Sequence, residues 1–150
     1  IHASAFEKIT GYIDRAAASS DADIIAGGEY DDSEGYFIRP TIIQSHKPDY
    51  ESMRDEIFGP VLTVQTFRTP QEAVDKANNT PYGLSAGIWT EKGSRILWMA
   101  EQLRAGVVWA NTYNQFDPAS PFGGYKESGF GREGGLHGLA PYLRAAGRVA

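Results

Sequence analysis

The 150-residue chain contains no cysteine. That absence excludes disulfides, thiolate metal sites and a cysteine nucleophile within these residues. The three histidines (His2, His46 and His137) are scattered, and no two of them have the spacing of metal ligands. The sequence therefore predicts no catalytic nucleophile and no metal site in this chain.

The chain also lacks a positive excess and a long apolar run. It has 19 acidic against 14 basic residues, a net charge of -5, and no basic run. A phosphate-backbone partner is therefore not expected. The strongly apolar stretch 105–110 is far shorter than a membrane span, and the first residues show no signal-peptide pattern. We expect a cytoplasmic protein with no nucleic-acid and no membrane partner.

What is present is typical of a soluble globular domain. Hydrophobic residues make up 41% and charged residues 22% of the chain. This length is enough for one domain with a core of its own. The chain begins at Ile1 rather than at a methionine, and it opens directly into a helical pattern. We expect it to be a piece of a longer polypeptide.

The first third of the chain predicts a helix followed by short strands. Phe6, Ile9, Ile13 and Ala16 recur at helical spacing, which indicates an amphipathic helix over residues 4–18. A short strand at 23–26 ends at two glycines, and residues 36–45 are rich in β-formers. Pro40 within this stretch predicts an edge strand or an irregular one. Residues 48–60 are expected to form a connection.

The middle of the chain alternates between strand and helix patterns. Strands are predicted at 61–67, 84–89 and 107–110, with helices from Pro70 to about Asn79 and from Thr90 to about Leu103. This order, with short connections, predicts an α/β fold with helices packed on a parallel sheet. The second helix is expected to bury Ile96, Leu97, Ala100 and Leu103.

Residues 111–138 are rich in glycine, and such a long ordered loop is often functional. Residues 129–134 match the pattern G-x-G-x-x-G. A dinucleotide fingerprint needs a strand before it, a helix after it and an acidic residue about 20 positions on. This sequence supplies neither the strand nor the acid, so we interpret the match as a tight glycine loop. A short helix near 136–143 and a last strand near Arg148 follow.

Glu56 and Phe58 form the first candidate site. A carboxylate can accept two ribose hydroxyls, and an aromatic ring can lie against a nicotinamide. On spacing alone, a solvated acid and a core phenylalanine are the favoured interpretation. Asp55 and Glu56 are adjacent, so in an extended segment they point to opposite faces and make a poor acid/base pair.

Two further groups have open interpretations. The aromatic residues Tyr113, Phe116 and Phe122 fit an apolar pocket or an ordinary core equally well. The charged residues of the glycine-rich segment are expected to be solvated or to form structural ion pairs rather than to be catalysts. These are Lys126, Glu127, Arg132 and Glu133.

Four segments, at 55–61, 78–84, 109–111 and 120–129, follow one another in the order and spacing of a known family. They read DEIFGPV, NNTPYGL, WAN and SPFGGYKESG, and the upstream segments AGG at 26–28 and GYFIRPT at 35–41 agree with them. With these motifs, essentially the whole chain resembles the C-terminal part of the aldehyde dehydrogenase superfamily. Residues 6–67 resemble the pyrroline-5-carboxylate (glutamate-semialdehyde) branch, whereas residues 116–118 and 131–135 resemble other branches.

The resemblance implies a fold and a set of roles. Residues 1–142 would be the parallel-sheet portion of an aldehyde dehydrogenase catalytic domain, and residues 143–150 an oligomerisation arm of a homo-oligomer. The cofactor would be NAD or NADP and the substrate a small-molecule aldehyde. Glu56 resembles the acid that binds the nicotinamide ribose, and Phe58 the aromatic residue beside the nicotinamide ring.

The resemblance also assigns the downstream residues. Phe122 resembles a pocket aromatic near the aldehyde, and Phe116 falls in the loop that closes over the substrate. Asn111 is expected to hold a loop rather than to act as a catalyst.

The family's covalent chemistry is missing from these residues. In this family a cysteine thiolate attacks the aldehyde, hydride passes to the cofactor, and a glutamate-activated water releases the acid. The cysteine and glutamate would lie before Ile1, so the isolated chain is expected to be inactive. The alternative is a non-catalytic, free-standing domain that binds or assembles with a dehydrogenase. A cysteine in a glycine-containing motif encoded upstream favours the enzyme, and a start codon at Ile1 favours the binding domain.

Overall fold

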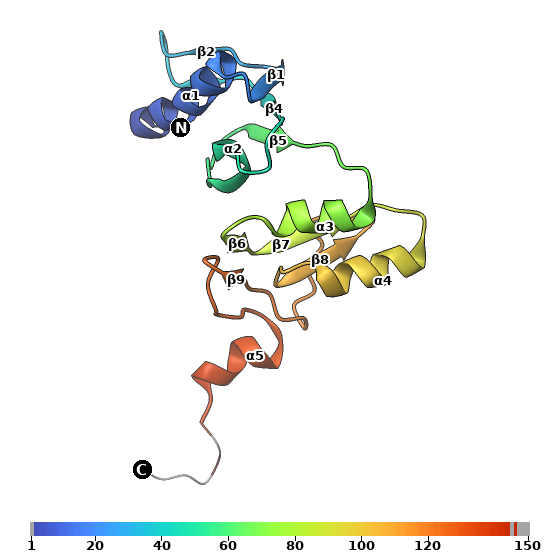
Figure 1. Ribbon diagram of the computed structural model, residues 1–150. Coiled ribbons are helices and arrows are strands. Elements are labelled where there is room, and N and C mark those ends of the chain that lie inside the picture. Colours follow the sequence, from blue (N-terminus) through green and yellow to red (C-terminus); the bar gives the residue numbers. More distant parts are fainter. Residues whose placement is uncertain (1, 145, 147–150) are drawn as a thin grey trace. The chain divides into compact units, whose positions relative to one another are not determined.

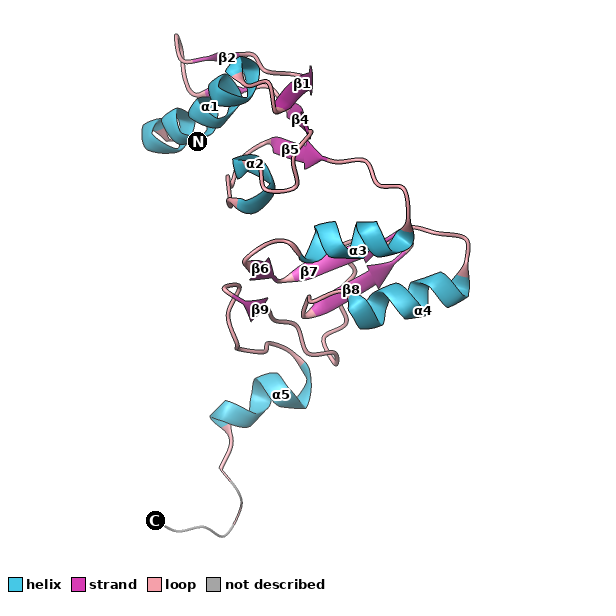
Figure 2. Cartoon of the chain, in the orientation of Figure 1, coloured by secondary structure: helices cyan, strands magenta, loops and turns pink. Residues whose placement is uncertain are grey.

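A computed structural model describes residues 2–144 and 146 of the chain. The chain divides into two compact units, residues 1–69 (unit 1) and residues 70–150 (unit 2). Both combine helices with strands, as Figures 1 and 2 show. Each unit is described by itself.

Unit 1 begins with helix α1, Ala3–Ala18. Its buried residues are Phe6, Ile9, Thr10, Ile13 and Ala16, which confirms the helix and the apolar stripe expected from their spacing. The helix starts at His2, whose Nδ1 accepts a hydrogen bond from the Ala5 amide at 3.2 Å. This bond satisfies one of the amides that a helix start leaves without a partner.

The main sheet of unit 1 has the order β1-β4-β5. Strand β1, Ala22–Ala26, is antiparallel to β4, Thr41–Ser45, and β4 is parallel to β5, Val61–Val64. Of the two alternatives predicted for residues 36–45, an edge strand or an irregular one, the irregular strand is confirmed, while β4 itself lies in the centre of this sheet. Pro40 lies just outside β4, separating it from strand β3, Phe37–Ile38, which pairs with β2, Tyr30–Asp31. Proline cannot donate to a ladder, so the strand begins after it.

Gly27 makes the turn after β1, as the sequence predicts. Its φ is 73°, in the left-handed region that favours glycine. A Cβ at this position would overlap the Pro40 carbonyl and come within 2.8 Å of the Thr41 Oγ1. The buried Thr41 hydroxyl accepts a hydrogen bond from the Gly28 amide at 2.9 Å, which ties the turn to the central strand.

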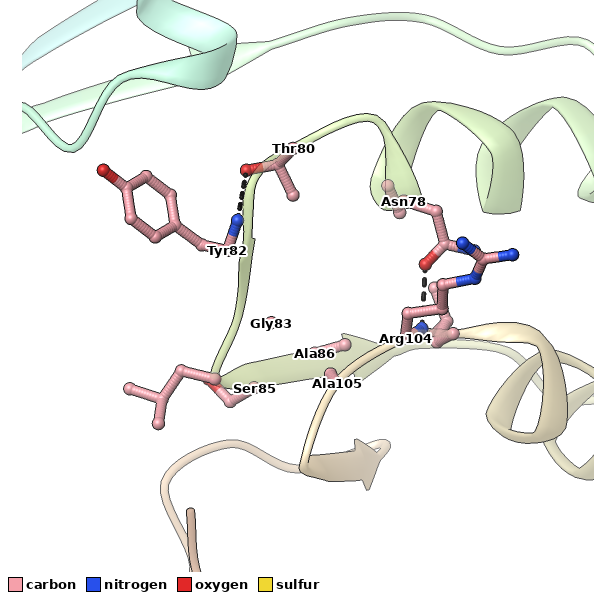
Figure 3. A pocket seen from close by; sticks show the side chains of 11 residues that line it. Asn78, Thr80, Tyr82, Gly83, Ser85, Ala86, Arg104 and Ala105 are labelled. Atoms are coloured by element: carbon pink, nitrogen blue, oxygen red, sulfur yellow. Dashed lines mark hydrogen bonds between the residues drawn. The ribbon is translucent and has the colours of Figure 1, made fainter. Parts of the chain in front are cut away.

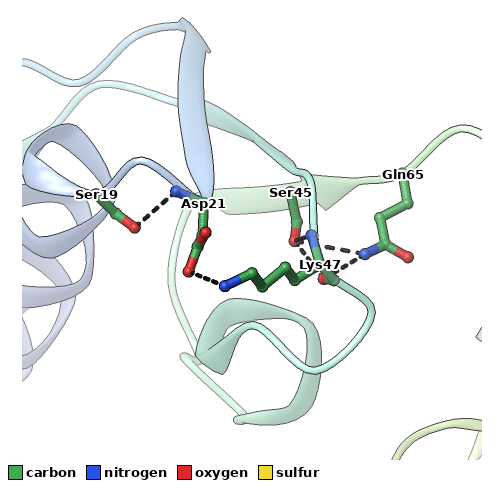
Figure 4. Close-up of polar contacts among 5 residues, drawn as sticks. All are labelled: Ser19, Asp21, Ser45, Lys47 and Gln65. Carbon is green, nitrogen blue, oxygen red and sulfur yellow. Dashed lines mark hydrogen bonds and ion pairs between the residues drawn. The ribbon is translucent and has the colours of Figure 1, made fainter.

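Polar contacts close the far end of β4, as Figure 4 shows. The Lys47 ammonium donates to Asp21 at 2.8 Å, and the Ser45 hydroxyl donates to the Lys47 carbonyl at 2.6 Å. The Gln65 amide also donates to that carbonyl. These bonds join the segments that follow β4 and β5 to the residues that precede β1.

Unit 2 contains two small sheets. Strand β7, Ser85–Ile88, is parallel to β8, Val107–Ala110, and β6, Tyr82–Gly83, is antiparallel to β9, Tyr125–Lys126. Helices α3, Pro70–Asn78, and α4, Gly93–Gln102, flank the β7-β8 pair (Figure 2). Helix α5, Gly135–Leu139, and a 3-10 turn, Ala140–Tyr142, follow.

The strand and helix order of this region is confirmed, but its assembly into one sheet is not. The strand expected at 61–67 belongs to the sheet of unit 1, while β7 and β8 form a separate parallel pair. Periodicity marks a segment as a strand without specifying its partner. The N-cap of helix α4 is Lys92 rather than Thr90, and Leu97, expected to be buried, is 69% exposed.

The connection expected at 48–60 contains a short helix, α2, Glu51–Arg54, which the sequence analysis missed. The strand expected near Arg148, and most of the arm at 143–150, fall outside the described residues. In the part of the chain that is described, no helix is long and apolar enough to cross a membrane.

Candidate functional site

The turn at residues 55–60 presents two candidate side chains outward around a buried one. Ile57 is buried with Ile9 and Ile13 of α1, whereas Glu56 and Phe58 on either side of it are exposed. Phe58 is 85% exposed, so the interpretation as a core phenylalanine is wrong. The Ile57 anchor fixes the direction of both neighbours.

The backbone of this turn is unusual at Phe58, whose φ is 58°. Residues with a Cβ rarely adopt this left-handed conformation, which persists only where the surroundings enforce it. The next residue, Gly59, packs directly on α1, and a Cβ there would lie 2.5 Å from the Ile9 Cδ1. Glycine at 59 lets the turn approach the helix, and that contact helps to hold Phe58 outward.

The two adjacent carboxylates of the turn have different surroundings. The Asp55 Oδ2 accepts a hydrogen bond from the Tyr12 hydroxyl at 2.8 Å, and this bond raises the pKa of Tyr12 above its usual value. The Glu56 carboxylate has no hydrogen bond or ion pair within the described residues, and only its backbone oxygen is engaged, by the Lys8 ammonium at 2.7 Å. Glu56 is thus the acid of the pair that is available to a ligand.

A recess of about 260 Å³ lies beside this turn. It is lined by Ser52, Met53, Asp55, Ile57, Phe58, Gly59, Val61 and Thr63. Thr63 donates to the Ser52 carbonyl at 2.9 Å, while the buried Ser52 hydroxyl has no hydrogen-bond partner within the described residues. Phe58 forms part of the rim, so the recess and the exposed ring belong to one surface of unit 1.

The aromatic candidates of unit 2 form one chain of ring contacts. Trp109 on β8 is 8% exposed and meets Tyr113 and Phe116 edge-on, with ring centroids 5.2 and 5.6 Å apart. Phe116 in turn meets Phe122 at 5.0 Å. The Trp109 indole also donates to the Gln115 carbonyl at 2.9 Å, which holds the loop close to the strand.

The exposed fractions argue against ordinary core for two of the three aromatic residues. Phe116 is 57% exposed and Tyr113 is also exposed, so neither is ordinary core. Phe122 is half-buried and is bridged to Glu133 by paired backbone hydrogen bonds of 2.7 Å. The group is a partly open apolar surface with a buried indole as its base.

Asn111 holds a loop, as expected. Its side-chain oxygen accepts from the Thr90 amide at 2.9 Å, and its side-chain nitrogen donates to the Thr90 carbonyl at 3.0 Å. The two bonds join the ends of β7 and β8. With its amide occupied in this way and a φ of 53°, Asn111 positions the start of the glycine-rich segment.

The two basic residues of the glycine-rich segment, Lys126 and Arg132, bond to the backbone. Lys126 donates to the carbonyls of Asn78 and Thr80 at 3.1 and 3.0 Å, and Arg132 donates to the Gly124 carbonyl at 2.8 Å. Their role is therefore structural, and the ion pairs found among the described residues do not include them. Residues 129–134 follow the short strand β9 as a loop.

A second recess, of about 200 Å³, lies between α3, β7 and the end of α4 (Figure 3). The Asn78 side chain in this recess already has hydrogen-bond partners. The Asn78 side chain accepts from the Arg104 amide at 2.8 Å and donates to the Gln102 carbonyl at 2.9 Å. Since these bonds tie the two helix ends together, we assign this recess a structural role. The described residues contain no cluster of three potential metal ligands.

Three residues of α1 hold the candidate turn and were not predicted from the sequence: Lys8, Tyr12 and Arg15. Their four- and three-residue spacing places them along one side of the helix, next to the apolar stripe. This spacing is the sequence signal from which a shared polar side of the helix could have been predicted. Only the fold shows that the segment at 51–56 lies against them.

The parallel strand pairs and the helices beside them define an α/β protein. Its candidate surfaces are the outward acid and aromatic ring of unit 1 and the aromatic loop of unit 2. The model of the aldehyde dehydrogenase family matches residues 1–146. The chain belongs to the aldehyde dehydrogenase family.

The chain is similar to several enzymes of that family. It is 45% identical over 144 residues to the mitochondrial benzaldehyde dehydrogenase of Antirrhinum majus, covering 96% of this chain and 27% of that one. It is 46% identical to a (Z)-2-((N-methylformamido)methylene)-5-hydroxybutyrolactone dehydrogenase of Acinetobacter baylyi, covering 91% and 28%. The betaine aldehyde dehydrogenase of Staphylococcus aureus, solved in complex with NAD+, superposes with a TM-score of 0.88 at 37% identity, covering 96% and 29%. The chain thus spans less than a third of the length of these relatives.

Proposed function

We propose that these residues are the C-terminal portion of an NAD(P)-dependent aldehyde dehydrogenase that oxidises an aldehyde to a carboxylic acid. Unit 1 contributes part of the cofactor site, and unit 2 contributes part of the aldehyde pocket. The observation that carries the proposal is the outward pair Glu56 and Phe58, held around the buried Ile57. The similarity of nearly the whole chain to dehydrogenases supports the same assignment.

The two residues suit the nicotinamide end of a dinucleotide. The Glu56 carboxylate can accept hydrogen bonds from two ribose hydroxyls, and charge-assisted bonds of this kind are among the stronger ones. The Phe58 ring exposes an apolar surface against which a flat heterocycle can lie. When bound, NAD(P)+ would accept the hydride, while the role of these two side chains is to bind and orient it.

The aromatic surface of unit 2 suits the organic part of an aldehyde. Phe116 and Phe122 offer ring edges, and the Trp109 contact keeps the loop that carries Phe116 near the strand. The similar enzymes named above act on chemically different substrates, so their names do not select one aldehyde. The pyrroline-5-carboxylate branch stays a prediction.

The assembly and location of the protein belong to the same proposal. Residues 143–150 would contribute to the contacts of a homo-oligomer, and the enzyme would be cytoplasmic. The location rests on composition, because relatives at this level of identity include mitochondrial enzymes.

Glu56→Gln tests the cofactor role. The test uses the polypeptide encoded by the complete reading frame that contains these residues. Losing the charge of one hydrogen-bonded acid should cost on the order of 1.5–3 kcal/mol in cofactor binding and hydride transfer. NAD+ and NADP+ titrations and single-turnover kinetics measure both effects. Glu34→Gln, at an exposed loop position, is the matched control. An unchanged affinity and an unchanged single-turnover rate would remove Glu56 from the site.

The reading frame itself tests the alternative, a non-catalytic domain that binds or assembles with a dehydrogenase. The proposed enzyme requires a cysteine codon within a glycine-containing motif upstream of Ile1. A start codon at Ile1 would instead favour the binding domain, because the 150 residues contain no cysteine to attack an aldehyde.

A further inference from the structure

One polar stripe of α1 contacts the segment that carries Glu56 and Phe58. Lys8, Tyr12 and Arg15 recur at intervals of four and three residues, so they lie along one side of the helix. The apolar stripe beside them buries Ile9 and Ile13. The polar stripe therefore runs along the edge of the core on which the turn packs.

The first two contacts reach the turn itself. The Lys8 ammonium donates to the backbone carbonyl of Glu56 at 2.7 Å, and the Tyr12 hydroxyl donates to the Asp55 Oδ2 at 2.8 Å. Two successive residues of the turn are thus bonded to two successive turns of one helix. Such paired contacts restrict both the translation and the rotation of the segment.

The third contact reaches the short helix before the turn. The Arg15 Nε and Nη2 donate to the two carboxylate oxygens of Glu51 at 2.8 and 2.9 Å. The Arg15 guanidinium also lies over the Tyr12 ring, 4.6 Å from its centroid. Arg15 thereby orients the Tyr12 ring, and the forked geometry of this pair is specific in direction.

This stripe separates the two adjacent carboxylates. Asp55 is held toward α1 by Tyr12, whereas the Glu56 side chain is left without a partner within the described residues. Two unrestrained neighbouring carboxylates would repel each other and sample many rotamers. With Asp55 fixed, only Glu56 faces a ligand, next to a Phe58 that is itself in a constrained backbone conformation.

We propose that Tyr12 is a positioning residue that, together with Lys8, fixes the turn so that Glu56 and Phe58 are oriented for the nicotinamide cofactor. The inference rests on the proposed function, because it assigns a purpose to the geometry of that same site. Both bonds lie at the surface, where a single hydrogen bond adds little to overall stability. Their principal effect is on the orientation of the turn.

The experiment uses the polypeptide encoded by the complete reading frame. Tyr12→Phe removes the hydroxyl and keeps the ring under Arg15. Tyr30→Phe is the matched control, since the Tyr30 hydroxyl donates to the Asp14 Oδ1 at the same 2.8 Å but does not contact the turn. We expect Tyr12→Phe to weaken NAD+ binding about threefold to tenfold, the range for one net hydrogen bond. We expect Tyr30→Phe to leave NAD+ binding unchanged. Both variants should keep the KM for the aldehyde and lose a similar, small amount of stability, since each loses one exposed hydrogen bond of 2.8 Å.

A double-mutant cycle distinguishes positioning from a general structural effect. If Tyr12 acts through the orientation of Glu56 and Phe58, then Tyr12→Phe should cause a smaller loss of NAD+ affinity in a Glu56→Gln background than in the wild type. Additive losses, or equal losses in Tyr12→Phe and Tyr30→Phe, would overturn the inference while leaving the cofactor role of Glu56 intact. If Glu56→Gln alone has no effect on NAD+ affinity, the proposed function fails, and the inference fails with it.

Lys8 provides an independent test if Tyr12→Phe does not fold. Lys8→Met removes the bond to the Glu56 carbonyl and keeps the aliphatic stem, and Lys8→Arg restores a donor. We expect weakened NAD+ binding in the first variant and at least partial rescue in the second. Equal affinity in both variants and the unmodified protein would contradict the positioning role.

Discussion

Unit 1 and unit 2 bury apolar side chains to different extents, although they are similar in length. Seven of the eleven buried hydrophobic residues in the described part of the chain belong to unit 1 and four to unit 2. In unit 1, six of these seven residues form two clusters around α1 and the central strand β4. In unit 2, helices α4 and α5 have no buried residue at all.

The candidate residues of the two units are held in correspondingly different ways. Glu56 and Phe58 flank a buried isoleucine and are fixed against a sixteen-residue helix. Phe116 is held by contacts among aromatic rings and by the indole hydrogen bond to its loop, and Phe122 by ring contacts and a single backbone bridge to Glu133. The candidate residues of unit 1 are therefore held more rigidly than those of unit 2.

The largest expected effect is the absence of aldehyde oxidation, because neither unit contains a cysteine. Each unit has candidate binding side chains, but neither has a thiol, so the purified 150-residue chain should show no aldehyde oxidation. Assays with NAD+ and NADP+ over a panel of aldehydes measure this. Turnover that persists after repurification, and that is abolished by Glu56→Gln, would show that the covalent step has another source.

The second prediction is that the 150-residue chain associates in solution. Unit 2 exposes many large apolar residues, and β7 and β8 form a sheet of only two strands. Open strand edges and apolar patches both favour association. Light scattering after size-exclusion chromatography, over a dilution series, should show mass increasing with concentration.

A pair of charge substitutions locates that association. Leu97→Lys on α4 should reduce it more than Phe67→Lys in unit 1, since both residues are well exposed but only Leu97 lies on the helix without buried residues. A sharp monomer at every concentration, with a cooperative melt, would show that the exposed surface of unit 2 is tolerated in a self-sufficient domain.

Local signals in the sequence predict much of the fold because they depend on near neighbours. The stripe Phe6, Ile9 and Ile13 specifies α1, and the glycines at 27 and 28 specify a turn. The pairing of β5 with β4 could not be predicted in this way, because a parallel partner is chosen by tertiary packing. Helix α2 was not predicted because its four residues are too few to show a helical periodicity.

In the candidate site, too, the sequence predicted which residues to consider but not their exposure. The identity of Glu56 and Phe58 followed from a motif, but their exposure depends on Ile57 meeting Ile9 across a separation of 48 residues. The exposure of Leu97 was likewise unpredictable, since helical periodicity gives the apolar side of α4 but not whether anything covers it.

The third prediction tests whether the packing of unit 2 can rearrange around an added methyl group. A Cβ at Gly106 would overlap the Gly123 carbonyl, where both sides of the contact are backbone. Gly106→Ala should therefore lower the free energy of unfolding by about 1–3 kcal/mol, the usual cost of overpacking. Gly93→Ala, at the first residue of α4 with nothing within 4 Å, should be neutral or stabilising by up to about 1 kcal/mol. Urea unfolding compares the two, and equal midpoints would mean that unit 2 rearranges to accept the clash.

The smallest expected effect is a pH dependence of stability that arises from Tyr12 in unit 1. The hydrogen bond to Asp55 raises the pKa of Tyr12 above its ordinary value of 10.0. A group whose pKa is raised by folding keeps its proton longer in the folded state than in the unfolded state. Its contribution to stability is therefore fully present below pH 10.0 and is lost as the pH rises through the higher pKa of the folded state.

Urea midpoints of the wild type and Tyr12→Phe, measured from neutral pH to above pH 10.0, test this sign. The advantage of the wild type should stay constant up to that pH and then shrink, because the ionised phenol can no longer donate to Asp55. Tyr30 has a pKa raised by Asp14 in the same way, so Tyr30→Phe shows whether the decline is shared between the two bonds. A difference that grows with alkaline pH would mean that the Tyr12 hydroxyl does not donate to Asp55 in solution. Only one of the two direct hydrogen bonds between α1 and the turn at residues 55–60, the bond from Lys8, would then remain.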